Sequence, residues 1–200
     1  EQFLIGGYID RGLNQIRTML ADLGMSVPGS PRAALLPLLW RCARLRWRGL
    51  HFTSRTADQV DPDTLLCVDA CWSAATGLLL VDMISAVAIS PRHLLVALDA
   101  GEPYRPAGAM ALESMARAAY PSGRALSRRL VEQSKELAKS VGQPHAIGVS
   151  RLADAMIAIS LGQWKNALTL SEDALAFLRD QCVGVTWELN MAQNVVIWAL

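Results

Sequence analysis

The stretch GVSRLADAMIAISLGQWKNALTLSEDALAFLR (Gly148–Arg179) predicts two helices that fold back on each other around the tight turn Leu161–Trp164. Helical hairpins of this kind carry small residues where the helices cross closely and an aromatic residue beside the turn. The residues found at those spacings are Ala155, Gly162, Trp164, Ala167 and Ala174. We expect Gly162 to end the first helix in a left-handed conformation and Trp164 to be buried beside the turn. One hairpin leaves an apolar face uncovered, so neighbours of the same type are expected to stack on it.

The composition of the 200 residues favours an all-α protein with a large core. Apolar residues make up 52% of the chain and charged residues 18%, which argues against disorder. Alanine and leucine dominate the apolar set, and runs of β-branched residues are rare, so helices are favoured over strands. The cysteines are scattered, as expected of buried thiols in a reducing cytoplasm. They are Cys42, Cys67, Cys71 and Cys182.

Neither end of the chain carries a helix-capping signal, and both ends are apolar, so we expect a fragment of a longer protein. No signal peptide is visible. The most apolar stretch is Ser73–Ser90, but Asp82 in its middle would be costly in lipid. This stretch predicts two buried helices around a turn at Asp82 rather than a membrane span.

Glycine, proline and capping residues divide the chain into about nine helices, with no convincing strand. We expect helices over residues 8–24, 30–49, 62–81, 90–101, 104–119, 124–141, 144–161, 164–183 and 185–200, after an earlier helix that ends within residues 1–6, and leave 82–90 unassigned. Residues 7–13 repeat the pattern of residues 162–168, and a looser echo occurs at Gly101. The helix after Gly7 buries a stripe of four residues, Leu13, Ile16, Leu20 and Leu23. The turns at Gly7, Gly101 and Gly162 are irregularly spaced. The prediction is therefore one degenerate helical-repeat region over 1–200, with sub-blocks 1–61, 62–120 and 121–200.

The helix over residues 30–49 combines an apolar side with an arginine stripe. We expect its apolar side to be buried, and this side consists of Leu36, Leu39, Trp40, Ala43 and Trp47. Arg41, Arg44 and Arg48 lie together on the opposite side. Residues 1–55 hold eight arginines against three acids, a net charge of +5, whereas residues 56–100 hold one arginine against six aspartates, a net charge of −5. The arginine stripe is therefore interpreted first as an ion-pairing face, second as a surface for a protein partner, and last as a nucleic-acid site.

No catalytic constellation is recognisable in the sequence. Cys67 and Cys71 are four residues apart, so on a helix they face the same way, and His93 is a conceivable third metal ligand. A fourth ligand is missing and the stretch is apolar, so buried thiols are favoured over a zinc site. His51 and His145 have no recognisable relation to a nucleophile. Phosphate-binding loops and kinase catalytic signatures are absent. We therefore expect no catalytic, cofactor-binding or metal-binding residue here.

The last helix carries polar residues that form a second candidate surface. These residues, which are Glu188, Asn190, Gln193 and Asn194, either line the concave side of a helical solenoid or face a further repeat, and the sequence does not separate these alternatives. The candidate partner surface from sequence consists of Arg41, Arg44, Arg48, Asn190 and Asn194.

Four segments together resemble a known class of protein. They are RLRWRGLHF (44–52), DACWSAATGL (69–78), RHLLVALDAGEPYR (92–105) and CVGVTWEL (182–189). Their order and spacing resemble the C-terminal tetratricopeptide-like repeat region of large bacterial serine/threonine protein kinases that also carry an AAA-type ATPase module. The resemblance implies a right-handed superhelix of stacked antiparallel helical hairpins, as degenerate tetratricopeptide-like repeats.

The resemblance further implies a non-catalytic interaction and regulatory module of a cytoplasmic signalling protein. Its expected partners are another protein or flanking domains of the same chain; nucleic acid and membranes are not expected partners. The parent chain is expected to be a serine/threonine protein kinase with an ATPase module. Two alternatives remain: a regulatory arm of an ATPase-linked transcription regulator and, less favoured, a small metal-dependent enzyme.

Overall fold

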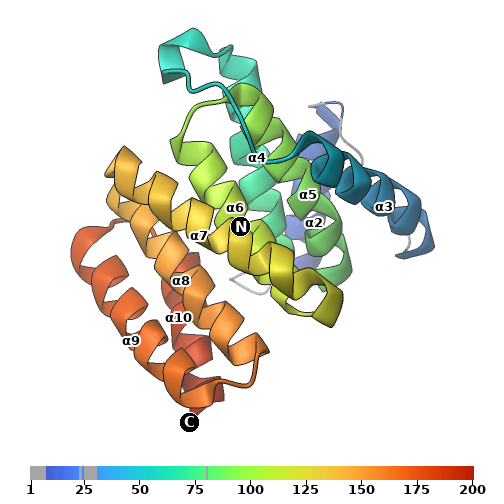
Figure 1. Cartoon of the computed structure of the whole chain (residues 1–200). Helices are drawn as coiled ribbons and strands as arrows, with labels where there is room; N and C mark the ends of the chain where they lie inside the picture. Colours follow the sequence, from blue (N-terminus) through green and yellow to red (C-terminus); the bar gives the residue numbers. More distant parts are fainter. Residues whose placement is uncertain (1–7, 23, 25–30, 80) are drawn as a thin grey trace. The chain divides into compact units, whose positions relative to one another are not determined.

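The computed structural model describes residues 8–22, 24, 31–79 and 81–200, and for residues 31–35 it describes the backbone alone. Within these residues all regular structure is helical, with nine α-helices, two short 3₁₀ turns and no strand, so the all-α prediction is confirmed. The helices, coloured along the chain in Figure 1, are α2 (Ile9–Asp22), α3 (Pro31–Arg48), α4 (Pro62–Leu78), α5 (Met83–Ala100), α6 (Tyr104–Ala118), α7 (Arg124–Val141), α8 (Pro144–Ser160), α9 (Trp164–Gln181) and α10 (Thr186–Ala199). The turns are η1 (Ala57–Gln59) and η2 (Pro121–Gly123).

The chain divides into two compact units, Glu1–Arg105 and Pro106–Leu200, so the division falls within α6. In the first unit α5 packs against α4 and α3, while α2 packs against α4. The predicted stripe of α2 is only partly described: Ile16 and Leu20 are buried, Leu13 is half-buried, and Leu23 lies outside the described residues. The expected turn at Gly7 and the helix before it also lie outside the described residues.

The hairpin of α4 and α5 is defined by two aspartate caps. Asp61 accepts a hydrogen bond from the Thr64 amide and begins α4, as predicted. Asp82 accepts bonds from the Ser85 amide at 3.1 Å and the Ser85 hydroxyl at 2.6 Å, and so begins α5. These bonds from Ser85 lower the pKa of the Asp82 carboxyl. The predicted turn at Asp82 is confirmed.

The predicted helix start at Ser90-Pro91 is wrong, because α5 begins at Met83 and contains Pro91 in its interior. A proline inside a helix removes one hydrogen bond, but the residues before it are held by burial. Ala86, Ala88 and Ile89 are all buried, so the Asp82 cap and packing together outweigh the proline. Of the described helices, α5 alone reaches the length and apolarity of a membrane span, and 67% of it is buried, as in a core helix.

The second unit contains most of α6 and the helices α7 to α10. Helix α8 packs against α7, α9 and α10, and α9 packs against α10. Buried serines from one helix donate to backbone carbonyls of another: Ser134 to Ala107 at 2.7 Å, and Ser171 to Ala192 at 2.6 Å. A small side chain that satisfies its own hydroxyl in this way allows the helices to approach closely.

The hairpin of α8 and α9 confirms the predicted crossing but not the predicted role of Trp164. Ala155, Ala167 and Ala174 are completely buried, and Gly162 has a φ of 72° in the turn. Trp164, however, is 53% exposed. It is the first residue of α9, and the core beside it consists of Ala155, Ala158, Ala167 and Val195. The expected burial of Trp164 is therefore wrong.

Candidate functional site

The arginine side of α3 faces the core of the first unit, and its apolar side faces solvent. Leu45, which lies among the arginines, is 3% exposed. The predicted buried side is instead exposed throughout: Leu36, Leu39, Trp40, Ala43 and Trp47. Trp40 is 71% exposed and Trp47 is 93% exposed. The prediction that these side chains are buried is wrong. We call these five residues the α3 apolar face.

The contacts of the arginines explain this orientation. Arg41 donates to the carbonyl of Ala88 in α5 at 3.1 Å. Arg48 donates to one carboxylate oxygen of Asp99 through Nε at 3.1 Å and through Nη2 at 2.8 Å, and Arg44 reaches the other oxygen at 3.7 Å. Arginine forks of this type are directional, so they fix the rotation of the helix about its axis. Part of the opposite charge of residues 1–55 and 56–100 is therefore paired internally.

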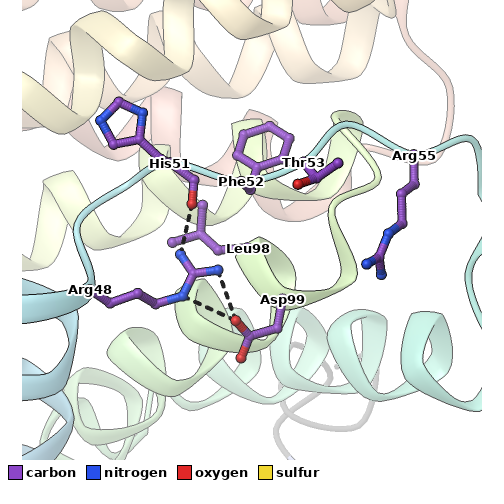
Figure 2. A pocket seen from close by; sticks show the side chains of 7 residues that line it. All are labelled: Arg48, His51, Phe52, Thr53, Arg55, Leu98 and Asp99. Carbon is purple, nitrogen blue, oxygen red and sulfur yellow. Dashed lines mark hydrogen bonds and ion pairs between the residues drawn. The ribbon is translucent and has the colours of Figure 1, made fainter.

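The same arginine supports an extended strap, residues 49–56, between α3 and η1. Arg48 also donates to the carbonyl of His51 at 3.1 Å, and the Arg55 amide donates to the carbonyl of Gly101 at 2.9 Å. Figure 2 shows Arg48 turned toward Asp99, whereas the His51 ring points away from that pair. The strap is thus held at both ends, by Arg48 and by Gly101.

A cavity of about 410 Å³ lies beneath the strap. Its lining is shown in Figure 2 and consists of Arg48, His51, Phe52, Thr53, Arg55, Leu98 and Asp99. The Arg48 guanidinium already bonds Asp99 and a backbone carbonyl, which leaves it few donors for a ligand. We therefore interpret the Arg48–Asp99 pair as a clamp that holds the strap and α3.

The less favoured metal-site alternative, Cys67, Cys71 and His93, is not supported by the part of the chain that the structure describes. No group of three or more histidine, cysteine or acidic side chains is suitably placed there. Burial, and then the neighbouring Cys67, raises the pKa of the Cys71 thiol to about 12. A thiol with that pKa stays protonated at neutral pH, as a thiol buried among apolar side chains does.

His93 is 1% exposed, and its Nδ1 has no hydrogen-bond partner among the described atoms. Its ring lies 5.9 Å from the ring of Trp72. Burial lowers the pKa of His93 to about 3, so the native state keeps the ring neutral. The chemistry of this histidine is that of a core residue rather than that of a base in a cleft.

We expect His93 to make the protein less stable in mild acid. Below a pH of about 6.5 the unfolded chain binds a proton at this ring, while the native state does not until about pH 3. The stability that depends on a neutral ring is complete above about pH 6.5 and is lost as the pH falls. Urea titrations at pH 7 and pH 5 should differ by about 2 kcal/mol from this group. His93→Leu should remove that difference, and the exposed control His51→Gln should keep it. If the free energy of unfolding of His93→Leu falls between pH 7 and pH 5 as much as that of the wild type does, the assignment to His93 is contradicted.

The other two predicted surface residues, Asn190 and Asn194, lie half-buried on α10 in the second unit. Their neighbour Glu188 is buried and lies 2.8 Å from Nε2 of His145. A cavity of about 830 Å³ also lies in this unit, and its lining includes the half-exposed Trp164 and Trp198. Whether Asn190 and Asn194 contact a partner stays a prediction.

Comparison of the chain with protein-family models, with curated proteins and with solved structures finds no match. The candidate site is therefore defined by geometry alone, and the α3 apolar face is its main feature. The sequence correctly predicts that these five residues share one face of the helix, but the prediction that this face is buried is wrong. Leu45, an apolar residue within the arginine stripe, was the available signal for the true orientation.

Proposed function

We propose that this chain is a non-catalytic helical-repeat interaction module, which regulates a bacterial multidomain signalling protein. The observation that supports the interaction role is the α3 apolar face. Large apolar side chains that lie together on the surface of a soluble protein are uncommon and usually mark an interaction site. Tryptophan and arginine are also the residues that contribute most to protein–protein binding.

The orientation of α3 supports this role, because the face is held outward. Leu45 anchors the helix on its inner side, and Arg41 and Arg48 bond to α5 on the same side. A face that is fixed before binding loses little conformational entropy when a partner arrives. The apolar face is therefore suited to recognition.

The assignment to a signalling protein rests on the resemblance of four sequence segments to the repeat region of kinases with an ATPase module. In that proposal the repeats stack as a tetratricopeptide-like superhelix, and α3 is part of its recognition surface. The open reading frame that contains this chain tests whether the longer protein is a kinase with an ATPase module. A frame that encodes neither a kinase nor a nucleotide-binding module would overturn the signalling assignment and leave the interaction role intact.

The interaction role is tested by a photo-crosslinking amino acid placed at position 47 in cells of the source organism. We expect a discrete crosslinked polypeptide from position 47, because Trp47 is almost fully exposed on the α3 apolar face. The matched control is position 139, where Lys139 is exposed on α7. Adding Trp40→Ala should abolish the product at position 47. The proposal fails if positions 47 and 139 give the same products, or if no polypeptide is captured at 47.

A further inference from the structure

We propose that the α3 apolar face binds an acidic amphipathic helix of a partner protein. This inference rests on the proposed function and names the chemistry of the partner. It follows from the shape of the face, from the charges at its two edges, and from the charge of the unit that carries it.

The α3 apolar face is a continuous stripe with an arginine on each side. Leu36, Trp40 and Trp47 are spaced by four and seven residues, so at 3.6 residues per turn they lie along one line of the helix. Arg44 lies on one edge of this stripe and Arg46 on the other, while the buried Leu45 points the opposite way. The surface is therefore apolar in the middle and basic along both edges.

The two edge arginines are available to a partner. Arg46 is exposed and makes no hydrogen bond or ion pair with any residue that the structure describes. Arg44 reaches Asp99 only at 3.7 Å, and its side chain remains 53% exposed. Helix α3 contains five arginines and no acidic residue, so nothing on the helix itself neutralises these edges. A partner with acidic residues at both edges of an apolar stripe would complement this surface.

The geometry favours a helix as the partner element. The stripe runs along α3 from Leu36 to Trp47, about 17 Å at 1.5 Å per residue. Side chains at intervals of three, four and seven residues form ridges that fit the grooves of a second helix. An extended peptide would gain few backbone hydrogen bonds here, since the backbone of α3 is helical and bonded internally except where Pro37 lacks a donor.

The charge of the surrounding unit favours a protein over a membrane surface. Residues 8–105 contain ten arginines and nine acidic residues, a net charge of +1, and no lysine. Helices that bind anionic membranes depend on a cluster of several cations, each contributing about 1 kcal/mol. Among the residues whose side chains the structure describes, Arg44 and Arg46 border the α3 apolar face, and two cations would attract a bilayer only weakly.

The test titrates the full chain with two synthetic helical peptides, measured by fluorescence anisotropy. Both peptides carry leucines at the spacing of one helix face; one has glutamates along both edges and the other has lysines at the same positions. The variants are Trp40→Ala/Trp47→Ala for the stripe and Arg44→Glu/Arg46→Glu for the edges. The matched charge control is Arg124→Glu/Arg128→Glu, which changes two exposed arginines on α7. All substituted side chains are exposed, and circular dichroism is to check that each variant folds.

We expect the acidic peptide to bind the wild type and the lysine peptide to bind at least about tenfold more weakly. The double tryptophan variant should weaken binding of the acidic peptide by about thirtyfold or more. The double arginine variant should reverse the preference between the two peptides, and the α7 control should behave as the wild type.

Three outcomes would overturn the inference. Equal binding of both peptides, unaffected by Arg44→Glu/Arg46→Glu, would show a helix-binding face without the acidic preference, and would leave the proposed function standing. Binding to vesicles of phosphatidylcholine and phosphatidylserine, lost in the double tryptophan variant, with no binding of either peptide would show a membrane face and would overturn both proposals. Dimerisation of the wild type in sedimentation, lost in the double tryptophan variant, would assign the face to a second copy of this chain.

Discussion

Replacing Gly101 with alanine is expected to lower the free energy of unfolding by about 3 kcal/mol, because two separate costs fall on this residue. Gly101 ends α5 with a φ of 77°, a left-handed conformation that strains any residue with a Cβ. A Cβ built there would also overlap the carbonyl oxygen of Thr53 in the strap. The strap would have to move, and the bond from the Arg55 amide to the Gly101 carbonyl would be lost with it.

A matched control separates the two costs. Gly142 has a nearly identical φ of 72°, but a Cβ built on it meets nothing within 4 Å. Gly142→Ala should therefore show the backbone strain alone, about 1 kcal/mol. Urea denaturation gives the two free energies, and hydrogen exchange at the Arg55 amide reports on the strap. If the two variants lose the same stability, and the Arg55 amide stays protected in Gly101→Ala, the close contact between strap and α5 is wrong.

Local signals in the sequence predicted most helix boundaries, because these boundaries depend on short-range chemistry. The sequence predicts the helix start after Asp61, the turn at Asp82, the helix end at Gly101 and the left-handed conformation of Gly162, and the structure has all four. Pro91 misled the prediction, because the burial of the residues before it comes from packing, which no local signal reports. Caps and glycines are therefore reliable signals of helix ends in this chain. A proline is a weaker signal, because packing can hold a helix together across it.

The orientation of helices was harder to predict than their boundaries. The spacing of Trp40 and Trp47 is equally consistent with a buried stripe and an exposed one, since periodicity identifies a face but not its neighbour. Asp99, which lies about fifty positions from Arg48 in the sequence, pairs with that arginine and so determines which face of α3 points inward. Long-range ion pairs of this kind leave no pattern in one segment. For this reason the sequence grouped these side chains on one face without predicting their exposure, and the candidate surface that it indicated was the arginine side together with Asn190 and Asn194.

The two tryptophans at the starts of α9 and α10 show the same limit. Trp164 occupies the position expected of a hairpin plug but is 53% exposed. Trp187 carried no such signal, yet it is 2% exposed and is one of the largest fully buried side chains among the described residues. Helix α10 packs against both α8 and α9, and packing between three helices is not revealed by a motif within one hairpin.

Trp187→Ala is therefore expected to lower the free energy of unfolding by about 3–5 kcal/mol, the usual cost of removing a buried tryptophan from a packed core. The loss includes the burial of the indole and the cavity left between α10 and its neighbours. Chemical denaturation, followed by the circular dichroism of the helices, measures it without depending on tryptophan fluorescence.

Trp164→Ala is the matched control, because it removes the same side chain from the start of the preceding helix. With half of its surface already in water, Trp164 should contribute about 1 kcal/mol or less. If Trp164→Ala lowers the free energy of unfolding more than Trp187→Ala does, Trp164 has the buried role that the hairpin pattern predicts. The burial of Trp187 at the start of α10 would then be wrong. A larger loss in Trp187→Ala would place the main aromatic anchor of this unit at the junction of three helices rather than at a single turn.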